Sequence, residues 1–450
     1  MTWLRVVCGA AALTLAGCHG QSQGGGGVGG NGVPDLAASD DLATSSPDLA
    51  GAADDLATTG PDLALSPADL ATSPPDLTPP NDLAITTCRR APAPANRVRH
   101  VVVTHPFAAD GSKDTRLEVL ALSQAGTLSK TGKTFDMGNL YDGRIVFTPD
   151  GELGFQPQDD GSIGEFRLDA SGTPTVLQAA FRGSFYAQRL VMDPSGERLY
   201  VIDSDTRDNG GGIISLRIGC DGALGEEGNI APAQLPYQLV FFPGDPTRAV
   251  VFAGGILDST GADDTYLLSW SPTAPKVLGQ ASAFGNSDAI TSSATLTPDG
   301  KLALFADHAN FSATTGDVAV VRIEGNKLTP LQLLTNLPGN TEVVVSPFEN
   351  AGIVVLSDTS DAIIGLKYAP TSATTPFTAT GPITYKGQKP QLPGVAILLD
   401  RGPLRGRVLI TEIDGVRQVQ FNADGTITDL GLFLVGGDLA TSVGAIGVQP

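Results

Sequence analysis

Short apolar stretches recur along the chain about once every 50 residues, and a tight turn follows each of them. The stretch Ala294–Asp307, ATLTPDGKLALFAD, shows the unit best: an apolar strand, a Pro-Asp-Gly turn and a second apolar strand. Variants of this unit begin at Ile145, Leu190, Leu239, Val343 and Val395. The pattern predicts a β protein built from repeated hairpins.

Each unit continues in the same way after its first hairpin. A polar loop leads to an alternating third strand, and a second turn leads to a fourth strand. The third strands read GEFRLDASG, GIISLRIGCDG, TYLLSWSP, DVAVVRIEGN and VRQVQFNADG. Four strands per unit, with turns at fixed offsets, are typical of the blade of a β-propeller, and the high glycine and proline counts (55 and 32) suit such short strands and tight turns.

The two ends of the repeat region complement one another. The segment from Val98, VRHVVVTHPF followed by RLEVLALSQAGTLSK, matches the second, third and fourth strands of a blade. The segment from Gly444, GAIGVQP, matches a first strand up to its proline. We therefore expect residues 88–450 to form an all-β, seven-bladed propeller, closed by a composite blade that leaves no sheet edge open in the ring.

The turns SPDG and TPDG, followed by LYVID and an alternating strand, resemble those of the lactonase-like, YVTN-type seven-bladed propellers of bacteria. The resemblance covers about residues 98–450. It implies the fold, whereas the activity stays open, because these families include lactonases, a muconate-cyclising enzyme and many surface or periplasmic proteins without assigned chemistry.

Residues 1–17 have the form of a secretory signal: Arg5 precedes a short apolar run. The tetrad Leu15-Ala16-Gly17-Cys18 resembles the bacterial lipobox, which implies that Cys18 is the lipidated residue of an exported lipoprotein. Acyl chains on Cys18 would anchor the protein stably to a membrane. Residue 19 is His rather than the Asp that resembles an inner-membrane retention signal of enteric bacteria. This favours the outer membrane, on its periplasmic or surface face. The alternative is an ordinary signal peptide with a chance cysteine.

Residues 18–87 read as a lipid-anchored, disordered tether. A glycine-rich start is followed by Asp-Leu repeats spaced mostly by seven, but frequent prolines exclude a long helix and so a coiled coil. A role of the repeated Asp-Leu-Ala in recognition is the alternative. An aspartate-leucine tether before a propeller also resembles exported proteins of myxobacteria.

The net charge of the chain argues against one class of partner. The net charge is -20, half of it from the ten aspartates of residues 19–87, which argues against nucleic-acid binding. We expect a monomer.

Cys88 and Cys220 remain as a pair after export to an oxidising compartment, and we expect them to form a disulfide that pins the arm before the first strand. Two separate thiols are the alternative.

When the first strands are aligned on their prolines, the position five residues before the proline is polar in most of them. This position is the start of the strand, where the central channel opens on the face that we call the top face. Arg144 and Arg189 would lie on adjacent blades, each with a tyrosine three residues earlier. Two neighbouring arginines suit a carboxylate or phosphate; the alternatives are pairing with an acid such as Asp142, or a solvated rim. The predicted ligand-binding residues are Arg144, Arg189, Gln238, Ser293, Glu342, Tyr141 and Tyr186.

The loops between second and third strands open on the same face and are acidic. Asp203, Asp205 and Asp208 are spaced closely enough to be a calcium candidate, although a solvated hairpin loop is the simpler interpretation. The sequence has no Cys/His metal spacing and no nucleophile elbow, so we expect no catalytic metal site and no cofactor beyond calcium.

The sequence therefore predicts an exported, membrane-anchored lipoprotein that binds a protein partner or a small anionic ligand at its top face without catalysis. The alternative is a lactonase-like hydrolase of a sugar lactone or related anion, with Arg144, Arg189 and Glu342 at the mouth. A structural role in an envelope complex is a third option.

Overall fold

The computed structural model describes residues 88–450 except 95, 109, 141–142, 205–210, 232, 257–263, 286–290, 308–316, 358–360 and 436–442. The predicted signal peptide, Cys18 and the predicted tether lie outside the described residues. Within the described part the chain is almost wholly β, with one 3₁₀ turn at Gly402–Leu404. None of the helices in that part is long and apolar enough to span a membrane.

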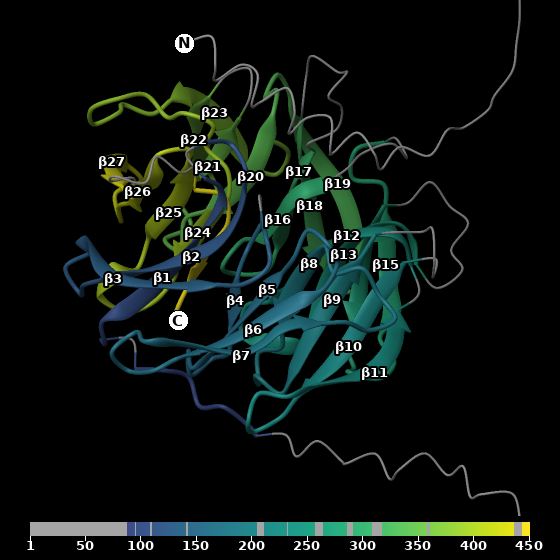
Figure 1. The fold of residues 1–450 in the computed structure, drawn as a ribbon. Coiled ribbons are helices and arrows are strands. Elements are labelled where there is room, and N and C mark those ends of the chain that lie inside the picture. The colour runs from purple at the N-terminus through teal and green to yellow at the C-terminus, as the bar shows by residue number, and fades with distance from the viewer. Residues whose placement is uncertain are drawn as a thin grey trace, which may run out of the picture. The chain divides into compact units, whose positions relative to one another are not determined.

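The described residues form seven four-stranded antiparallel sheets, each ordered from an inner to an outer strand (Figure 1). Blade 1 contains β4 (Val146–Phe147), β5 (Leu153–Pro157), β6 (Ile163–Leu168) and β7 (Pro174–Phe181). Blade 2 contains β8 (Arg189–Met192), β9 (Arg198–Asp203), β10 (Gly212–Ile218) and β11 (Leu224–Ala231). Blade 3 contains β12 (Ala233–Phe242), β13 (Asp245–Ile256), β14 (Thr265–Ser269) and β15 (Lys276–Ala281).

The other four blades follow the same plan. Blade 4 contains β16 (Thr291–Leu296), β17 (Leu302–Asp307), β18 (Val318–Glu324) and β19 (Lys327–Leu334). Blade 5 contains β20 (Asn340–Val345), β21 (Ala351–Leu356), β22 (Ala362–Tyr368) and β23 (Phe377–Pro382). Blade 6 contains β24 (Ala396–Leu399), β25 (Arg407–Glu412), β26 (Gly415–Phe421) and β27 (Ile427–Leu434). Blade 7 contains β28 (Ile446–Val448), β1 (Arg99–Phe107), β2 (Lys113–Leu122) and β3 (Leu128–Asp136).

Blade 7 is the predicted composite of both ends of the repeat region. Its sheet has the order β28-β1-β2-β3, and Ile446 of β28 is the antiparallel partner of Val103 of β1. Figure 1 shows the C-terminus beside β1. The predicted seven-bladed propeller, closed by a composite blade, is thereby confirmed.

The hydrophobic core of the described part lies between the blades. Seven clusters of buried apolar side chains each join two neighbouring sheets, and together they run round the whole ring. The cluster that seals the ring contains Val101 and Val103 of blade 7 with Leu409 of blade 6. Apolar burial of this kind is what stabilises a propeller, because each sheet alone leaves both of its faces uncovered.

The inner strands of blades 7 and 1 approach one another closely. The Ile145 amide donates to the carbonyl oxygen of Ile446 over 3.0 Å. A Cβ added to Gly447 would lie 2.6 Å from both the Cβ and the carbonyl oxygen of Ile145. Only glycine fits at this position without moving the backbone of the neighbouring blade.

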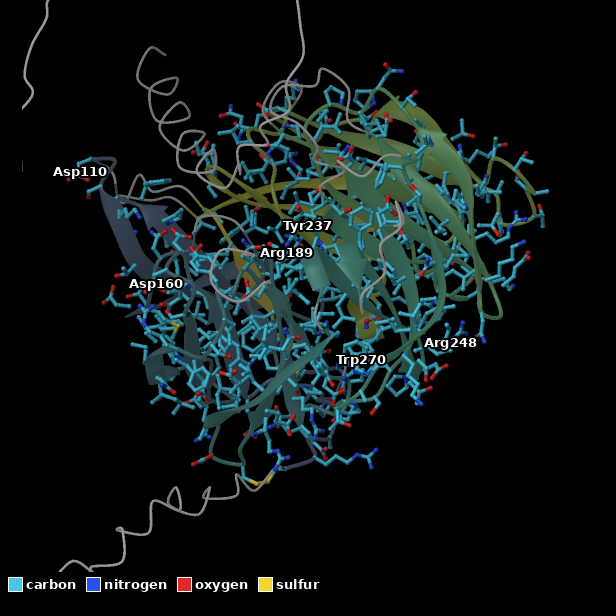
Figure 2. The ribbon with its side chains drawn as sticks, turned by 90° about the vertical axis from the view of Figure 1, so that its right-hand side faces the viewer. Asp110, Asp160, Arg189, Tyr237, Arg248 and Trp270 are labelled. Carbon is cyan, nitrogen blue, oxygen red and sulfur yellow. A yellow bond between two sulfur atoms is a disulfide. The ribbon has the colours of Figure 1, made fainter. Side chains whose placement is uncertain are left out.

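The arm from Cys88 to Arg97 runs along the bottom face, where the inner strands end. Cys88 forms a disulfide with Cys220, which lies in the turn between β10 and β11, so the predicted disulfide is confirmed. Figure 2 shows this sulfur–sulfur bond at the lower edge of the ribbon. Arg90 adds an ion pair to Asp150 at 3.0 Å and donates to the Gly219 carbonyl. The arm is therefore fastened to blades 1 and 2 together.

A buried acid lies beneath the turn that carries Cys220. Glu165 of β6 is only 1% exposed, and its Oε1 has no hydrogen-bond partner among the described residues. A Cβ on Gly222 would lie 2.2 Å from that oxygen, so the turn closes directly over the carboxyl group. Burial, reinforced by the nearby Asp221, raises the pKa of Glu165 to about 7.

Candidate functional site

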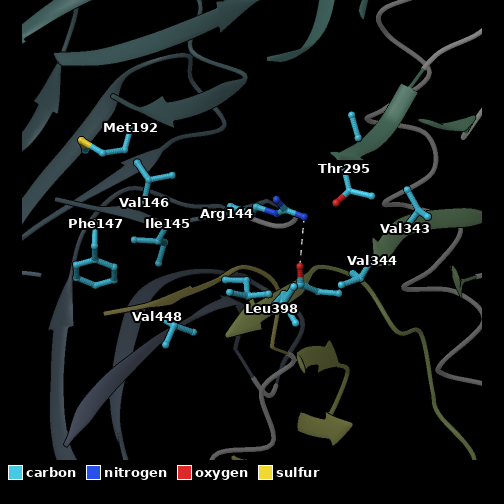
Figure 3. A pocket seen from close by; sticks show the side chains of 13 residues that line it. Arg144, Ile145, Val146, Phe147, Met192, Thr295, Val343, Val344, Leu398 and Val448 are labelled. Atoms are coloured by element: carbon cyan, nitrogen blue, oxygen red, sulfur yellow. Dashed lines mark hydrogen bonds between the residues drawn. The ribbon is translucent and has the colours of Figure 1, made fainter. Parts of the chain in front are cut away.

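The candidate site is the top mouth of the central channel, where the inner strands begin. Arg144 immediately precedes β4, and Glu342 lies on β20, four blades further along the chain. The Arg144 guanidinium reaches across the mouth: its Nη2 lies 2.7 Å from Glu342 Oε2 and 3.2 Å from the carbonyl oxygen of Ala396. Figure 3 shows Arg144 extended across the opening, with the bond to Ala396 dashed. A residue of blade 1 thus joins blades 5 and 6.

The two members of this ion pair differ in their access to solvent. The Arg144 side chain is 46% exposed, whereas that of Glu342 is 7% exposed. Both hydrogen bonds that the Arg144 side chain makes to described residues come from Nη2, which leaves Nε and Nη1 without a partner among those residues. A molecule arriving from the top face therefore meets the cation first, with the carboxylate behind it.

The other predicted polar residues of the mouth bind backbone atoms of neighbouring inner strands. Arg189 of blade 2, labelled in Figure 2, is exposed and donates from Nη1 to the Ser292 carbonyl at 2.5 Å. Gln238 of blade 3 donates to the same carbonyl at 2.9 Å. The Ser293 hydroxyl accepts the Val343 amide at 3.3 Å. These contacts tie blades 2 and 3 to blade 4, and blade 4 to blade 5, across the part of the ring where the channel opens.

The two tyrosines that were predicted beside the arginines have different outcomes. Tyr141 lies outside the described residues, as does Asp142. The Tyr186 hydroxyl donates to the Asp159 carbonyl, and its ring covers Gly161, whose added Cβ would lie 2.4 Å from Cδ2 of that ring. The structure therefore places Tyr186, which was predicted with Arg189, over the loop between β5 and β6.

The calcium candidate is only partly described. Asp203 is 2% exposed and accepts the Tyr186 amide at 3.1 Å, while Asp205 and Asp208 lie outside the described residues. Within the part of the chain that the structure describes, no group of three or more acidic, histidine or cysteine side chains is placed to hold a metal ion. Asp203 thus helps to position the turn before β8, and the calcium hypothesis stays a prediction.

Below the arginine, the channel contains a cavity of about 380 Å³. Apolar side chains from several inner strands line it, and Figure 3 shows them arranged around Arg144. They include Ile145, Val146, Met192, Val344, Ile397 and Leu398. Thr295 is the lining residue with a neutral polar side chain.

This cavity is the part of the site that sequence reasoning missed, although a signal for it was present. The position three residues before each aligned proline lies between the two positions whose side chains pack between blades, so its own side chain is expected to face the channel. If water filled the channel, we would expect polar residues at this position. It is instead occupied by Val146, Val191, Val240, Thr295, Val344, Ile397 and Gly447. An apolar residue at most of these positions indicates an apolar channel.

Several solved structures resemble this chain in fold. A provisionally assigned 6-phosphogluconolactonase from Bacteroides fragilis aligns with a TM-score of 0.55 and 14% identity, over 80% of this chain and 100% of its own. One from Bacteroides uniformis aligns with a TM-score of 0.56 and 13% identity, over 78% and 99%. A hypothetical selenium-binding protein from Sulfolobus tokodaii aligns with a TM-score of 0.58 and 10% identity, over 79% and 94%.

No protein-family model matches the sequence, and the search of curated proteins finds no match. Identities at this level carry the fold alone. The described part of the chain is thus a seven-bladed β-propeller whose structural neighbours include lactonase-like propellers, and its chemistry has to be argued from its own residues.

Proposed function

We propose that this protein is an exported lipoprotein, anchored through Cys18, whose propeller binds a small anionic ligand at the top mouth without chemical turnover. The observation that carries the proposal is the Arg144 guanidinium, half exposed over a cavity and with Nε and Nη1 directed away from its bonds to described residues. A planar guanidinium with two adjacent donors suits a carboxylate or phosphate.

The position of Glu342 favours binding over the lactonase alternative. Glu342 is the one acid in the polar column of the aligned inner strands, and a hydrolase of this type needs an acid or base within reach of its substrate. Its side chain is 7% exposed and lies behind the Arg144 guanidinium at 2.7 Å. This arrangement supports a structural role for Glu342 as the group that orients Arg144.

The position of the arm indicates on which face of the propeller the preceding chain enters. The chain leaves the propeller at Cys88 on the bottom face, held there by the disulfide to Cys220. The chain that follows an anchor at Cys18 would therefore enter the propeller on the bottom face. Metabolic labelling with a fatty acid, followed by loss of the label in Cys18→Ser, tests the anchor directly.

The ligand proposal is tested on the unlipidated mature chain, residues 18–450 carrying Cys18→Ser. Thermal unfolding is followed by the fluorescence of Trp270, which is 6% exposed, in the presence of carboxylates, phosphate, phosphosugars and a sugar lactone. We expect one class of anion to raise the melting temperature, and Arg144→Gln to abolish that rise. A flat response to every anion would overturn the proposal, and turnover of the lactone would establish the hydrolase instead.

A further inference from the structure

The chemistry of the channel beneath Arg144 restricts the class of anion further. The cavity of about 380 Å³ is lined by aliphatic side chains, Met192 and Phe147, with Thr295 and Arg144 as the lining residues that carry polar groups. Arg144 lies at the entrance to this space and Val448 lines it from the composite blade. The site therefore has a charged entrance and an apolar body.

A polyhydroxylated ligand suits such a space less well than an acyl chain. A sugar hydroxyl that leaves water needs a new hydrogen-bond partner, and among the described lining side chains only Thr295 and Arg144 offer one, beside the peptide groups of the inner strands. An acyl chain needs no such partner, and each methylene buried against the apolar side chains raises the affinity about fourfold. The lining thus selects by the apolar length of the ligand rather than by its hydroxyl groups.

The entrance selects the head group. The guanidinium of Arg144 keeps its Nη2 on Glu342 and Ala396, so Nε and Nη1 are the donors that remain for a carboxylate. Glu342, 7% exposed, neutralises part of the arginine's charge and holds its plane fixed across the mouth. One anionic group matches this single guanidinium, because the other arginine of the mouth, Arg189, already donates from Nη1 to a backbone carbonyl of blade 4.

We propose that the ligand is an amphipathic monocarboxylate, whose head group binds Arg144 and whose acyl chain occupies the channel. The proposal rests on the function proposed above and names the ligand class for the same site. It predicts that affinity rises with chain length until the cavity is full.

The test compares butanoate, octanoate and gluconate on the mature chain carrying Cys18→Ser, by isothermal titration calorimetry. We expect octanoate to bind at least tenfold more tightly than butanoate, and gluconate more weakly than either. Arg144→Gln lowers the octanoate affinity at least tenfold. Ala294→Phe, which fills part of the channel, lowers octanoate binding and spares butanoate. Leu434→Ala, on an outer strand and 57% exposed in the parent, leaves both affinities unchanged and controls for adsorption to the surface.

The outcomes separate this inference from the function on which it rests. Equal binding of all three carboxylates through Arg144 would leave the anion site standing and overturn the amphipathic class. Octanoate binding that survives Arg144→Gln would overturn the assignment of the head group. Binding of none of the three would overturn the amphipathic class, and phosphate in the thermal series would then decide the anion site. The chain-length comparison needs no variant, so a failure of Ala294→Phe to fold leaves the proposal testable.

Discussion

The bottom and top faces of this propeller are built in opposite ways. On the bottom face a disulfide, the Arg90–Asp150 ion pair and backbone bonds hold the arm against blades 1 and 2, and Arg90 is only 9% exposed. On the top face a half-exposed arginine extends over an apolar cavity. The bottom therefore contributes mainly to stability, whereas the top is available to a ligand, as is common for loops held by a rigid scaffold.

The largest effect is expected where the ring closes. Ile446→Asp places a charge at a fully buried position of β28, between blades 6, 7 and 1. We expect a loss of about 4 kcal/mol or more in the free energy of unfolding, measured by urea denaturation with Trp270 fluorescence. Val98→Asp, at a site that is 50% exposed, is the matched control and changes stability little. Equal stabilities of the two variants would contradict the closure of the ring by β28.

The disulfide should have the next largest effect. Its two cysteines are separated by 132 residues, so Cys88→Ser/Cys220→Ser removes a long cross-link and costs about 3 kcal/mol of unfolding free energy. Reduction of the parent protein with dithiothreitol should lower its free energy of unfolding by the same amount. Ligand binding at the top mouth should survive in both cases; its loss would show that the two faces are coupled.

Glu165 gives the bottom face a pH dependence. Its pKa is raised from 4.5 to about 7 in the folded protein, so the folded state binds more protons than the unfolded state between these values. The stability linked to Glu165 is present below pH 4.5 and is lost as the pH rises through 7. Relative to the parent, Glu165→Gln should therefore gain about 2 kcal/mol between pH 4.5 and 8, less than the full linkage value because the surrounding structure relaxes when the carboxyl ionises.

The comparison is made with Glu152→Gln, which replaces an exposed glutamate of the same blade. Subtracting the parent's profile from that of each variant removes the contribution of every other titrating group. A flat difference between Glu165→Gln and the parent would show that Glu165 is solvated in the folded protein.

The smallest effect on stability is expected at the top mouth. Because Arg144 is 46% exposed, a double-mutant cycle of Arg144→Gln and Glu342→Gln should give a coupling below about 1 kcal/mol. Arg144→Gln should nonetheless abolish anion binding, whereas Glu342→Gln should weaken it moderately by freeing the arginine to move. A coupling of several kcal/mol would place the pair with the structural contacts of the bottom face.

The sequence by itself determined the fold. The proline-terminated hairpins fixed the strand order of each blade, and the partial units beginning at Val98 and Gly444 fixed the closure of the ring. The pairing of Cys88 with Cys220 also followed, because a repeat register places both at the same end of the blades. These features depend on local periodicity, which a single sequence records.

Only the tertiary structure decided which residues contact one another at the mouth. The repeat alignment places Arg144 at the start of its inner strand, at the top of the channel. At that level the inner strands of all the blades surround the channel, so the alignment does not say which blade Arg144 contacts. Among the described residues, the acid that pairs with Arg144 is Glu342, 198 residues away in the sequence. The apolar cavity likewise exists because seven inner strands meet round one axis, and no single strand shows the space that they enclose.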